Sequence, residues 1–486
     1  MKLGHRAFAV SCVIFASTLG QAQTDSELDL LLEEVLIIGS KDAANTVSGA
    51  ANFIDEDDLD RFDQIDLRKV LNQVPGVYIR EEDGYGLRPN IGIRGAAAER
   101  SQKVTILRDG VLITPAPYSA PAAYYVPNVS RISSVEVLKG PSAAAHGPHT
   151  VGGVINMASN PVPIDATGSI DLSAGSDGYY KGQASYGVTF GNFGYFIDVL
   201  TYGADGFKSV DQNGQSTGFE RSDFGIKFLY QLPDSKFKHK VTLLIEGGDE
   251  DADETYLGLT DADFREDPYR RYAASQLAKF KSEHHNLLLN YSVTVSDSTS
   301  ANFKVYWNEF DRSWNKLDGF LSGPSLQRVL QSPNQYQRYY SVLTGQKNSS
   351  GYDNETLDVT NNDRQFESSG FQWSLADSRM IGSFSMDSQV GIRVHNDQVE
   401  RNHQPATYFM TDFVLQGDNI LRMPKVRNRA ETDAYAVYAL SRFSISDFSL
   451  DLGVRHENID GKLINYLTDV TKGQKQYLTA PSVSGI

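Results

Sequence analysis

The segment 447–457 reads Asp-Phe-Ser-Leu-Asp-Leu-Gly-Val-Arg-His-Glu, and its apolar residues recur at every second position from Phe448 to Val454. Because successive strand side chains point to opposite faces, this period of two places one face in an apolar medium and the other in water. The same alternation recurs in 302–308 and in 386–397. Several of these runs approach the roughly 9 to 11 residues that cross a bilayer at a tilt, and exceed the roughly five or six of a soluble strand. The pattern predicts transmembrane β-strands, and a soluble β-sandwich is the alternative that alternation alone leaves open.

The segments between these strands differ in length. Short turns such as Gly191-Asn192 and Ser446-Asp447 alternate with long polar stretches at about 246–283 and 311–368. Short turns on one side and long loops on the other are the expected sidedness of an outer-membrane barrel.

The first 22 residues are typical of a secretory signal peptide. Lys2, His5 and Arg6 precede an apolar run that is too short for the roughly 20 residues of a spanning helix, which is the alternative. The only cysteine, Cys12, lies inside this segment, so the exported chain would have no thiol chemistry, cysteine-bound metal or disulfide. The net charge of −16 argues against nucleic acid as a partner, because phosphate binding needs a basic face.

Residues 23–40 form a linker that ends in an unusual apolar patch, Glu34-Val35-Leu36-Ile37-Ile38-Gly39. Such a patch can be an ordinary buried strand. It can also be a docking strand, because a β-prone segment at a mobile end can be added to the sheet edge of another protein. Its position directly after an export signal favours the docking interpretation.

Residues 41–160 have a compact, glycine-rich, mixed α/β pattern. Asp66 is placed to cap a short helix that buries Leu67, Val70 and Leu71 and ends at Pro75-Gly76. Strands are expected at 104–107 and 135–138, each followed by a turn that contains glycine. Residues 161–486 then carry the barrel strands.

Five motifs of this compact region resemble, in order and spacing, the plug motifs of TonB-dependent outer-membrane receptors. They are Val70-Leu71-Asn72-Gln73-Val74-Pro75-Gly76-Val77, Ile91-Gly92-Ile93-Arg94-Gly95, Ile106-Leu107-Arg108-Asp109-Gly110-Val111, Val135-Glu136-Val137-Leu138-Lys139-Gly140-Pro141 and Gly147 with Gly152-Gly153-Val154-Ile155-Asn156. The resemblance implies an α+β plug domain inside an antiparallel transmembrane β-barrel in the outer membrane of a Gram-negative bacterium. It also implies that Glu34, Val35, Leu36, Ile37, Ile38 and Gly39 form the TonB box, the segment gripped by the periplasmic energy transducer TonB with its inner-membrane motor complex.

Two further segments, 115–125 and 267–276, resemble receptors of the ferric citrate type. The resemblance implies active uptake of a ferric chelate such as ferric citrate or a carboxylate siderophore. Receptors of the same fold for cobalamin, haem or sugars, and a passive porin-like channel, are the alternatives. His146 and His149 depart from the family pattern, which puts the local packing there in doubt.

The number of strands is smaller than the resemblance implies. Plugged transporters have roughly 22 barrel strands, whereas only about eleven or twelve can be placed after residue 165. We therefore expect about the first half of such a barrel, with the C-terminal part missing from this sequence.

No motif supports bond-making chemistry, so the chain is not expected to be an enzyme. No resident cofactor is expected either, because iron would be carried within the substrate. Histidines such as His284 and His285 could ligate a metal, but loop histidines are more often structural. No metal site is therefore predicted.

The candidate ligand residues are those suited to an anionic chelate, because guanidinium groups bind carboxylates through two parallel hydrogen bonds. Arg94 is the first candidate, since its motif position is one where the ferric citrate receptor's plug supplies a ligand-binding arginine. The alternative is that Arg94 locks the plug to acidic groups of the barrel wall. Arg88, Tyr85 and Tyr118 are further candidates from plug loops, and Arg393 falls on the lumen-facing phase of its strand.

Overall fold

The computed structural model describes residues 36–486, except for Ser48, 62–64, Glu81, Ala123, Asn213, Asp234, Asp447 and Ile486. The expected signal peptide and two residues of the expected TonB box, Glu34 and Val35, lie outside the described residues. Among the described residues, no helix has the length and apolarity needed to cross a membrane.

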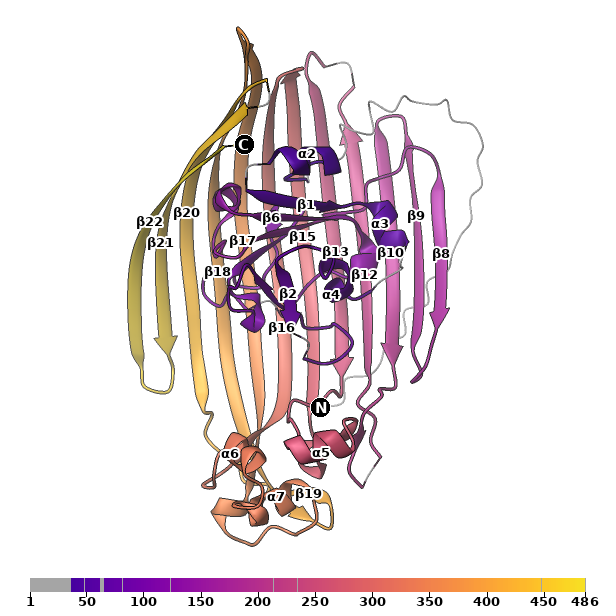
Figure 1. Cartoon of the computed structure of the whole chain (residues 1–486), viewed down its shortest axis with the longest axis vertical. Coiled ribbons are helices and arrows are strands. Elements are labelled where there is room, and N and C mark those ends of the chain that lie inside the picture. The colour runs from indigo at the N-terminus through magenta and orange to yellow at the C-terminus, as the bar shows by residue number, and fades with distance from the viewer. Residues whose placement is uncertain are drawn as a thin grey trace.

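The largest unit of the described chain is a single antiparallel sheet of 13 strands, which curves around the N-terminal domain (Figure 1). Its long strands pair with their neighbours in sequence order, and the short β19 (Val414–Gly417) pairs with β18. The long strands are β8 (Thr167–Ala174), β9 (Tyr180–Phe190), β10 (Phe193–Ala204), β12 (Phe219–Gln231), β13 (Lys238–Ala252), β15 (Lys279–Ser296), β16 (Thr299–Phe320), β17 (Leu357–Ile381), β18 (Phe384–Thr411), β20 (Val426–Ile445), β21 (Phe448–Asn465) and β22 (Val470–Gly485).

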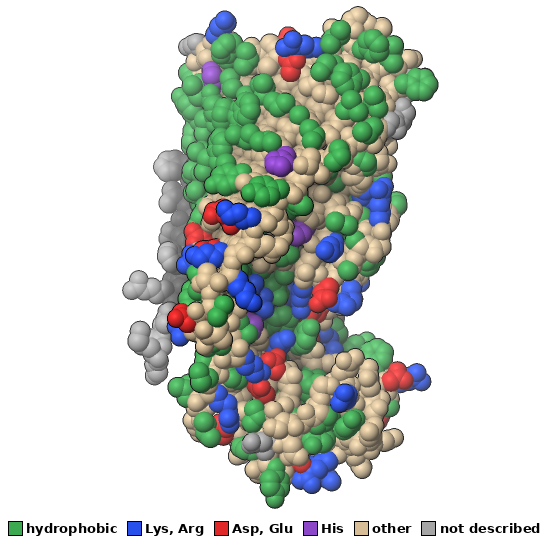
Figure 2. All heavy atoms as spheres, turned by 90° about the vertical axis from the view of Figure 1, so that its left-hand side faces the viewer, with side chains coloured by type: hydrophobic (Ala, Val, Ile, Leu, Met, Phe, Trp, Pro, Cys, Tyr) green, Lys and Arg blue, Asp and Glu red, His purple; other side chains and the backbone are tan. Residues whose placement is uncertain are grey.

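The strands have the two-faced character that the alternation predicts. In β21, Leu452 and Val454 point outward and are 40% and 45% exposed, whereas Arg455 points inward and is 4% exposed. The face shown in Figure 2 carries a band of hydrophobic side chains over its upper part and charged side chains below. The outward apolar band is suited to contact lipid, and the polar inner face contacts the plug.

The expected loop boundaries were wrong for the long polar stretches. The strand β13 continues to Ala252 and β15 begins at Lys279, while β16 continues to Phe320. Beyond the apolar band an outward side chain has no need to be apolar, so the strands continue without the alternation that marks them. Asp251 of β13 instead pairs with Lys279 and Lys281 of β15 at 2.7 and 2.9 Å.

Short turns lie at the upper end of the sheet in Figure 1 and longer loops with small helices at the lower end, as the turn lengths predict. The loop elements are β11 (Ser209–Val210), α5 (Asp261–Glu266), β14 (Arg270–Arg271), η4 (Ala273–Ser275), α6 (Leu326–Gln331), α7 (Gln337–Leu343) and η5 (Asp353–Glu355). These loops have their own apolar cluster, which includes Val329, Val342 and Met410.

The N-terminal domain, the plug, lies against the inner face of the curved sheet (Figure 1). Its core is a five-stranded sheet in the order β1-β6-β7-β4-β5, with β2 and β3 as a separate hairpin. The elements are α2 (Lys41–Thr46), β1 (Ala50–Ile54), α3 (Glu56–Asp60), α4 (Leu67–Leu71), β2 (Val77–Arg80), β3 (Asn90–Ile93), η1 (Glu99–Ser101), β4 (Val104–Arg108), β5 (Val111–Leu112), η2 (Val129–Arg131), β6 (Ile132–Lys139), η3 (Pro141–His146) and β7 (Gly153–Ser159).

The local predictions for the plug are confirmed. The Asp66 side chain accepts a hydrogen bond from the Arg68 backbone N–H, which caps α4, and Leu67, Val70 and Leu71 are buried. The strands expected at 104–107 and 135–138 are β4 and β6. The fold is therefore the predicted α+β plug with antiparallel barrel strands.

Candidate functional site

Three arginines lie side by side on the inner face of the sheet. Arg312 of β16 is in register with Arg364 of β17, which is in register with Arg401 of β18. We call these residues the arginine row. Like charges directly opposite one another destabilise a sheet, so the row is not explained by strand pairing.

A plug tyrosine sits against this row. The guanidinium carbons of Arg312 and Arg364 lie 4.3 and 5.9 Å from the ring centroid of Tyr124. A third guanidinium, from Arg100 of the plug, lies 5.5 Å from the same ring and is held by the carboxylate of Glu82. Burial works against ionisation of Tyr124, but these guanidinium groups lower the pKa of its hydroxyl below the ordinary value. The environment of this ring is therefore strongly cationic.

The arginine row lacks the counter-charges that buried cations usually have. Arg312 is 4% exposed, and the buried Nε atoms of Arg312 and Arg364 have no hydrogen-bond partner. The hydrogen bonds of Arg312 and Arg401 go to neutral oxygens, those of Asn362 and Asn428. Within the part of the chain that the structure describes, no carboxylate pairs with any of the three. Burying an unpaired charge is costly, so the row is suited to an anion that supplies the missing acceptors.

Sequence reasoning missed the arginine row. Its members are far apart in the chain, and only the register of three strands brings them together. The alternation along β18 could have identified one member, because Arg401 points to the same inner face as the predicted Arg393.

Arg88 and Tyr85, predicted as ligand residues, contact the barrel strands and their loops. Arg88 is buried, forms an ion pair with Glu250 of β13, and lies 4.3 Å from the ring centroid of Phe280. The Tyr85 ring packs against Phe207 and Phe219 at centroid distances of 5.4 and 4.7 Å. Burial raises the pKa of the Tyr85 hydroxyl to about 12, and nearby carboxylates add to the shift.

Tyr118 and Arg393, also predicted, lie together at another plug–barrel contact. The Tyr118 hydroxyl donates to Glu457 at 3.1 Å, and its backbone N–H donates to Asp397 at 2.7 Å. Arg393 points inward, as its phase predicts, and donates to the backbone carbonyls of His146 and Gly147. Both side chains therefore attach the plug to the wall.

Arg94 lies elsewhere on the plug. Its side chain is exposed and lies beside Gly140. The Nη1 atom of Arg94 would be 3.3 Å from a Cβ atom placed on that glycine. Burial and the charge of Arg94 together lower the pKa of the neighbouring Lys139. Arg94 is not among the arginines that contact Tyr124, and its role in substrate binding stays a prediction.

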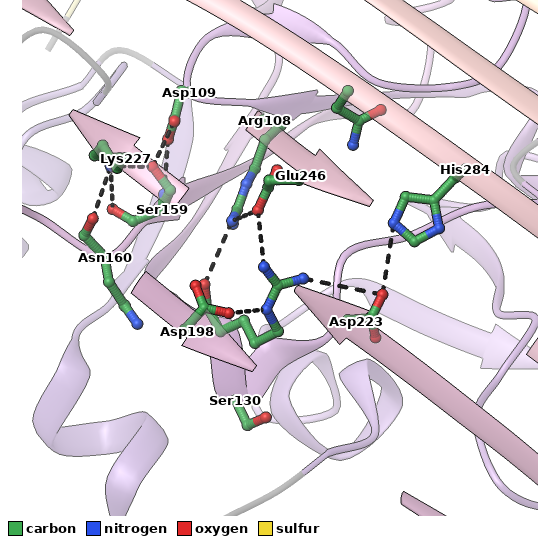
Figure 3. A network of polar contacts seen from close by, with 12 residues as sticks. Arg108, Asp109, Ser130, Ser159, Asn160, Asp198, Asp223, Lys227, Glu246 and His284 are labelled. Carbon is green, nitrogen blue, oxygen red and sulfur yellow. Dashed lines mark hydrogen bonds and ion pairs between the residues drawn. The ribbon is translucent and has the colours of Figure 1, made fainter. Parts of the chain in front are cut away.

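A buried ion network holds the plug to the sheet (Figure 3). Glu246 of β13 accepts from Arg108 of the plug at 2.7 Å and lies 3.5 Å from the guanidinium of Arg131. Arg131 also pairs with Asp198 and lies 3.9 Å from Asp223. We call these five residues the plug lock. Their burial makes the attachment sensitive to the loss of any one charge.

The described part of the expected TonB box, Leu36 to Gly39, is folded against the plug. Ile37 and Ile38 pack against an apolar cluster that contains Leu107, Leu138 and Val154. The segment also lines a cavity of about 430 Å³ between the plug and the sheet, together with Lys304, Gln372 and Arg393. Among the described residues, no group of three or more His, Cys, Asp or Glu side chains is placed to hold a metal ion.

Comparison with known proteins agrees with this architecture. Residues 43–154 match the TonB-dependent receptor plug domain. Vitamin B12 transporter BtuB of Photobacterium profundum is 27% identical over 175 residues, which are 36% of this chain and 27% of that protein. The unliganded ferric citrate transporter FecA superposes with a TM-score of 0.73 at 20% identity over 92% of this chain and 62% of that chain. BauA, the ferric preacinetobactin receptor of Acinetobacter baumannii, gives a TM-score of 0.66 at 16% identity, and the match covers 93% of this chain and 63% of that chain.

The chain thus spans 27% of the length of the curated relative and 62% of the FecA chain. Its N-terminal domain is similar to the plug domain of TonB-dependent receptors, which is in keeping with the predicted location in the outer membrane of a Gram-negative bacterium. These relatives are named as receptors and transporters, which is in keeping with the expectation that the chain is not an enzyme. The expectation that further barrel strands are missing from this sequence stays a prediction.

Proposed function

We propose that this chain belongs to a receptor that takes up an anionic ferric chelate across the outer membrane, driven by the energy transducer TonB. The observation that carries the proposal is the arginine row beside Tyr124, which has no carboxylate partner among the described residues and in which the buried Nε donors of Arg312 and Arg364 have no acceptor. A chelate with several carboxylates would supply acceptors for these donors, because carboxylates match the two-pronged geometry of guanidinium.

Ferric citrate or a similar carboxylate siderophore is the substrate class that fits best. The likeness of the fold to FecA, whose name specifies ferric citrate, is in keeping with this choice. Iron would enter as part of the substrate, so we propose no resident cofactor. Vitamin B12 is the second candidate, because the curated relative is named as its transporter.

In the proposed mechanism the chelate binds between plug loops and barrel strands, where Arg100 and Tyr124 of the plug face the arginine row. TonB then grips residues 34–39 and pulls on the plug. The plug lock must open for a passage to form along the sheet, since its buried ion pairs attach the plug to β10, β12 and β13.

The test is uptake of radioactive ferric citrate by cells that carry the full-length gene as their only ferric citrate receptor. Deletion of residues 34–39 should abolish uptake, and retained uptake would indicate a passive channel. Arg312→Gln should weaken binding about 10- to 150-fold, since a hydrogen bond to a charged group contributes about 1.5–3 kcal/mol. Arg379→Gln is the matched control, because Arg379 is exposed near the end of β17 and pairs with Asp377. Labelled vitamin B12 is offered in parallel, and its uptake without ferric citrate uptake would overturn the chelate assignment.

A further inference from the structure

One buried carboxylate of the plug receives hydrogen bonds from the described part of the expected TonB box, residues 36–39, which we call the docking segment. Glu136 of β6 is 0% exposed, and its oxygens accept from the backbone N–H groups of Ile37, Ile38 and Gly39 at 2.9, 2.7 and 3.0 Å. The side-chain amide of Asn156 on β7 donates a further bond at 2.6 Å.

The backbone of the segment is shaped for this acceptor. Successive N–H groups that converge on one point form an anion-binding concavity, and such a turn needs a residue in the left-handed region. Gly39 supplies that conformation with φ +97°, where a side chain would strain the backbone although space around it is open. The segment therefore binds the carboxylate through its conformation and not through its side-chain chemistry.

The carboxylate depends on the segment in turn. Its hydrogen-bond partners are three backbone N–H groups and one amide, and it forms no ion pair with a charged side chain of the described residues. If the segment left, Glu136 would keep Asn156 but lose the three backbone donors. Hydrogen bonds to an ionised acceptor are stronger than those between neutral groups, so this loss would oppose release.

We infer that Glu136 is a positioning residue that holds the docking segment against the plug, so that the segment becomes available to a partner only when these bonds open. The inference rests on the proposed function, because it takes residues 34–39 as the segment that TonB grips. The inference adds that Glu136 determines the fraction of receptors in which the segment is released from the plug before a partner binds.

The contacts of Asn156 extend this arrangement toward the barrel wall. Its side-chain oxygen accepts from the backbone N–H of Gly110 at 2.9 Å. The carbonyl oxygens of Asp109 and Gly110 accept from Lys304 at 2.7 Å and from Gln372 at 3.2 Å. Movement of the 109–110 turn would therefore shift the Asn156 side chain, whose amide donates to Glu136 beside the docking segment.

The experiment places a spin label at Leu36→Cys in the full-length receptor, purified without TonB, and measures the mobile fraction by electron paramagnetic resonance. Glu136→Gln should raise the ratio of mobile to immobile label about tenfold, because the segment loses its charged acceptor. Glu56→Gln is the matched control, since Glu56 is an exposed plug glutamate on α3, and it should leave the ratio unchanged.

The dependence on pH separates this role from general loosening of the plug. Burial raises the pKa of Glu136, so the mobile fraction should grow as the pH falls through that raised value. Glu136→Gln should abolish this dependence, whereas a purely structural role would leave it in place.

Gly39→Ala keeps the test decisive if Glu136→Gln unfolds the plug, which protease resistance reports. It strains the segment without touching the plug core, and it should raise the mobile ratio several-fold. If both variants have a folded plug, a mobile fraction like that of the wild type in both would overturn the inference. If Glu136→Gln is unfolded, a wild-type mobile fraction in Gly39→Ala would overturn it. Because no TonB is present, this result is independent of the uptake test, whose failure would instead overturn the proposed function.

Discussion

Replacing Glu246 by Gln should loosen the plug by breaking the plug lock at its shared acceptor. Glu246 is 2% exposed and is the carboxylate partner of Arg108, whose Nε and Nη1 atoms have no hydrogen-bond partner. Arg131 would keep its pair with Asp198, but Arg108 would be left as a buried, unpaired cation. Removing one partner of a buried pair costs about 3–5 kcal/mol, and we expect the lower end because Gln keeps an acceptor oxygen.

The assay is hydrogen exchange of the full-length receptor in membranes, followed by mass spectrometry of peptides that contain β4. Amides of this strand exchange through opening of the plug, so a loss of about 3 kcal/mol should accelerate their exchange about 150-fold. Glu283→Gln is the control, because Glu283 is exposed on β15, and it should leave the exchange unchanged.

A double variant tests the physical reason. In Arg108→Met with Glu246→Leu both charges are gone, and apolar replacement of a buried pair is often neutral, so most of the protection should return. The reasoning is refuted if Glu246→Gln exchanges like the wild type, or if the double variant is as poorly protected as the single one.

The remaining predictions concern the arginine row and the plug. Arg364→Gln should stabilise the ligand-free receptor by about 0.2–1 kcal/mol, because it removes like charges between paired strands, and it should weaken chelate binding. Urea unfolding measures the first effect and a binding titration the second. A loss of stability would contradict the conclusion that the arginine row has no counter-charges. Because the folded-state pKa of Tyr124 lies below its ordinary value of about 10, the free energy of plug unfolding should rise as the pH passes from the lowered pKa to that value. Urea titrations at several pH values should show this rise in the wild type and its absence in Tyr124→Phe. Asp66→Ala removes the cap of α4 and should cost about 1 kcal/mol of plug stability, whereas the exposed Asp60→Ala should cost less; equal effects would contradict the capping role.

The sequence predicts well those features that a few neighbouring residues determine. The inward direction of Arg393 follows from the alternation within β18, and the cap at Asp66 follows from the residues next to it. The arginine row depends on which residue of one strand pairs with which residue of the next, across loops whose ends the alternation does not mark. A register shift of one residue would turn any of these arginines to the other face, so pairing had to be known before the row could be found.

The arginines that point toward the interior differ in what accepts their hydrogen bonds, and this difference separates attachment from binding. Arg88, Arg108 and Arg131 each have a carboxylate of the barrel strands as a partner. Arg312 and Arg364 have no carboxylate partner among the described residues, although they lie in the same lumen. A chelate carboxylate that paired with Arg108 would have to displace Glu246 and leave that carboxylate buried, whereas one that paired with Arg312 would displace no anion. An anionic substrate should therefore bind at the arginine row without opening the plug lock, and opening the lock is left to the pull on the docking segment.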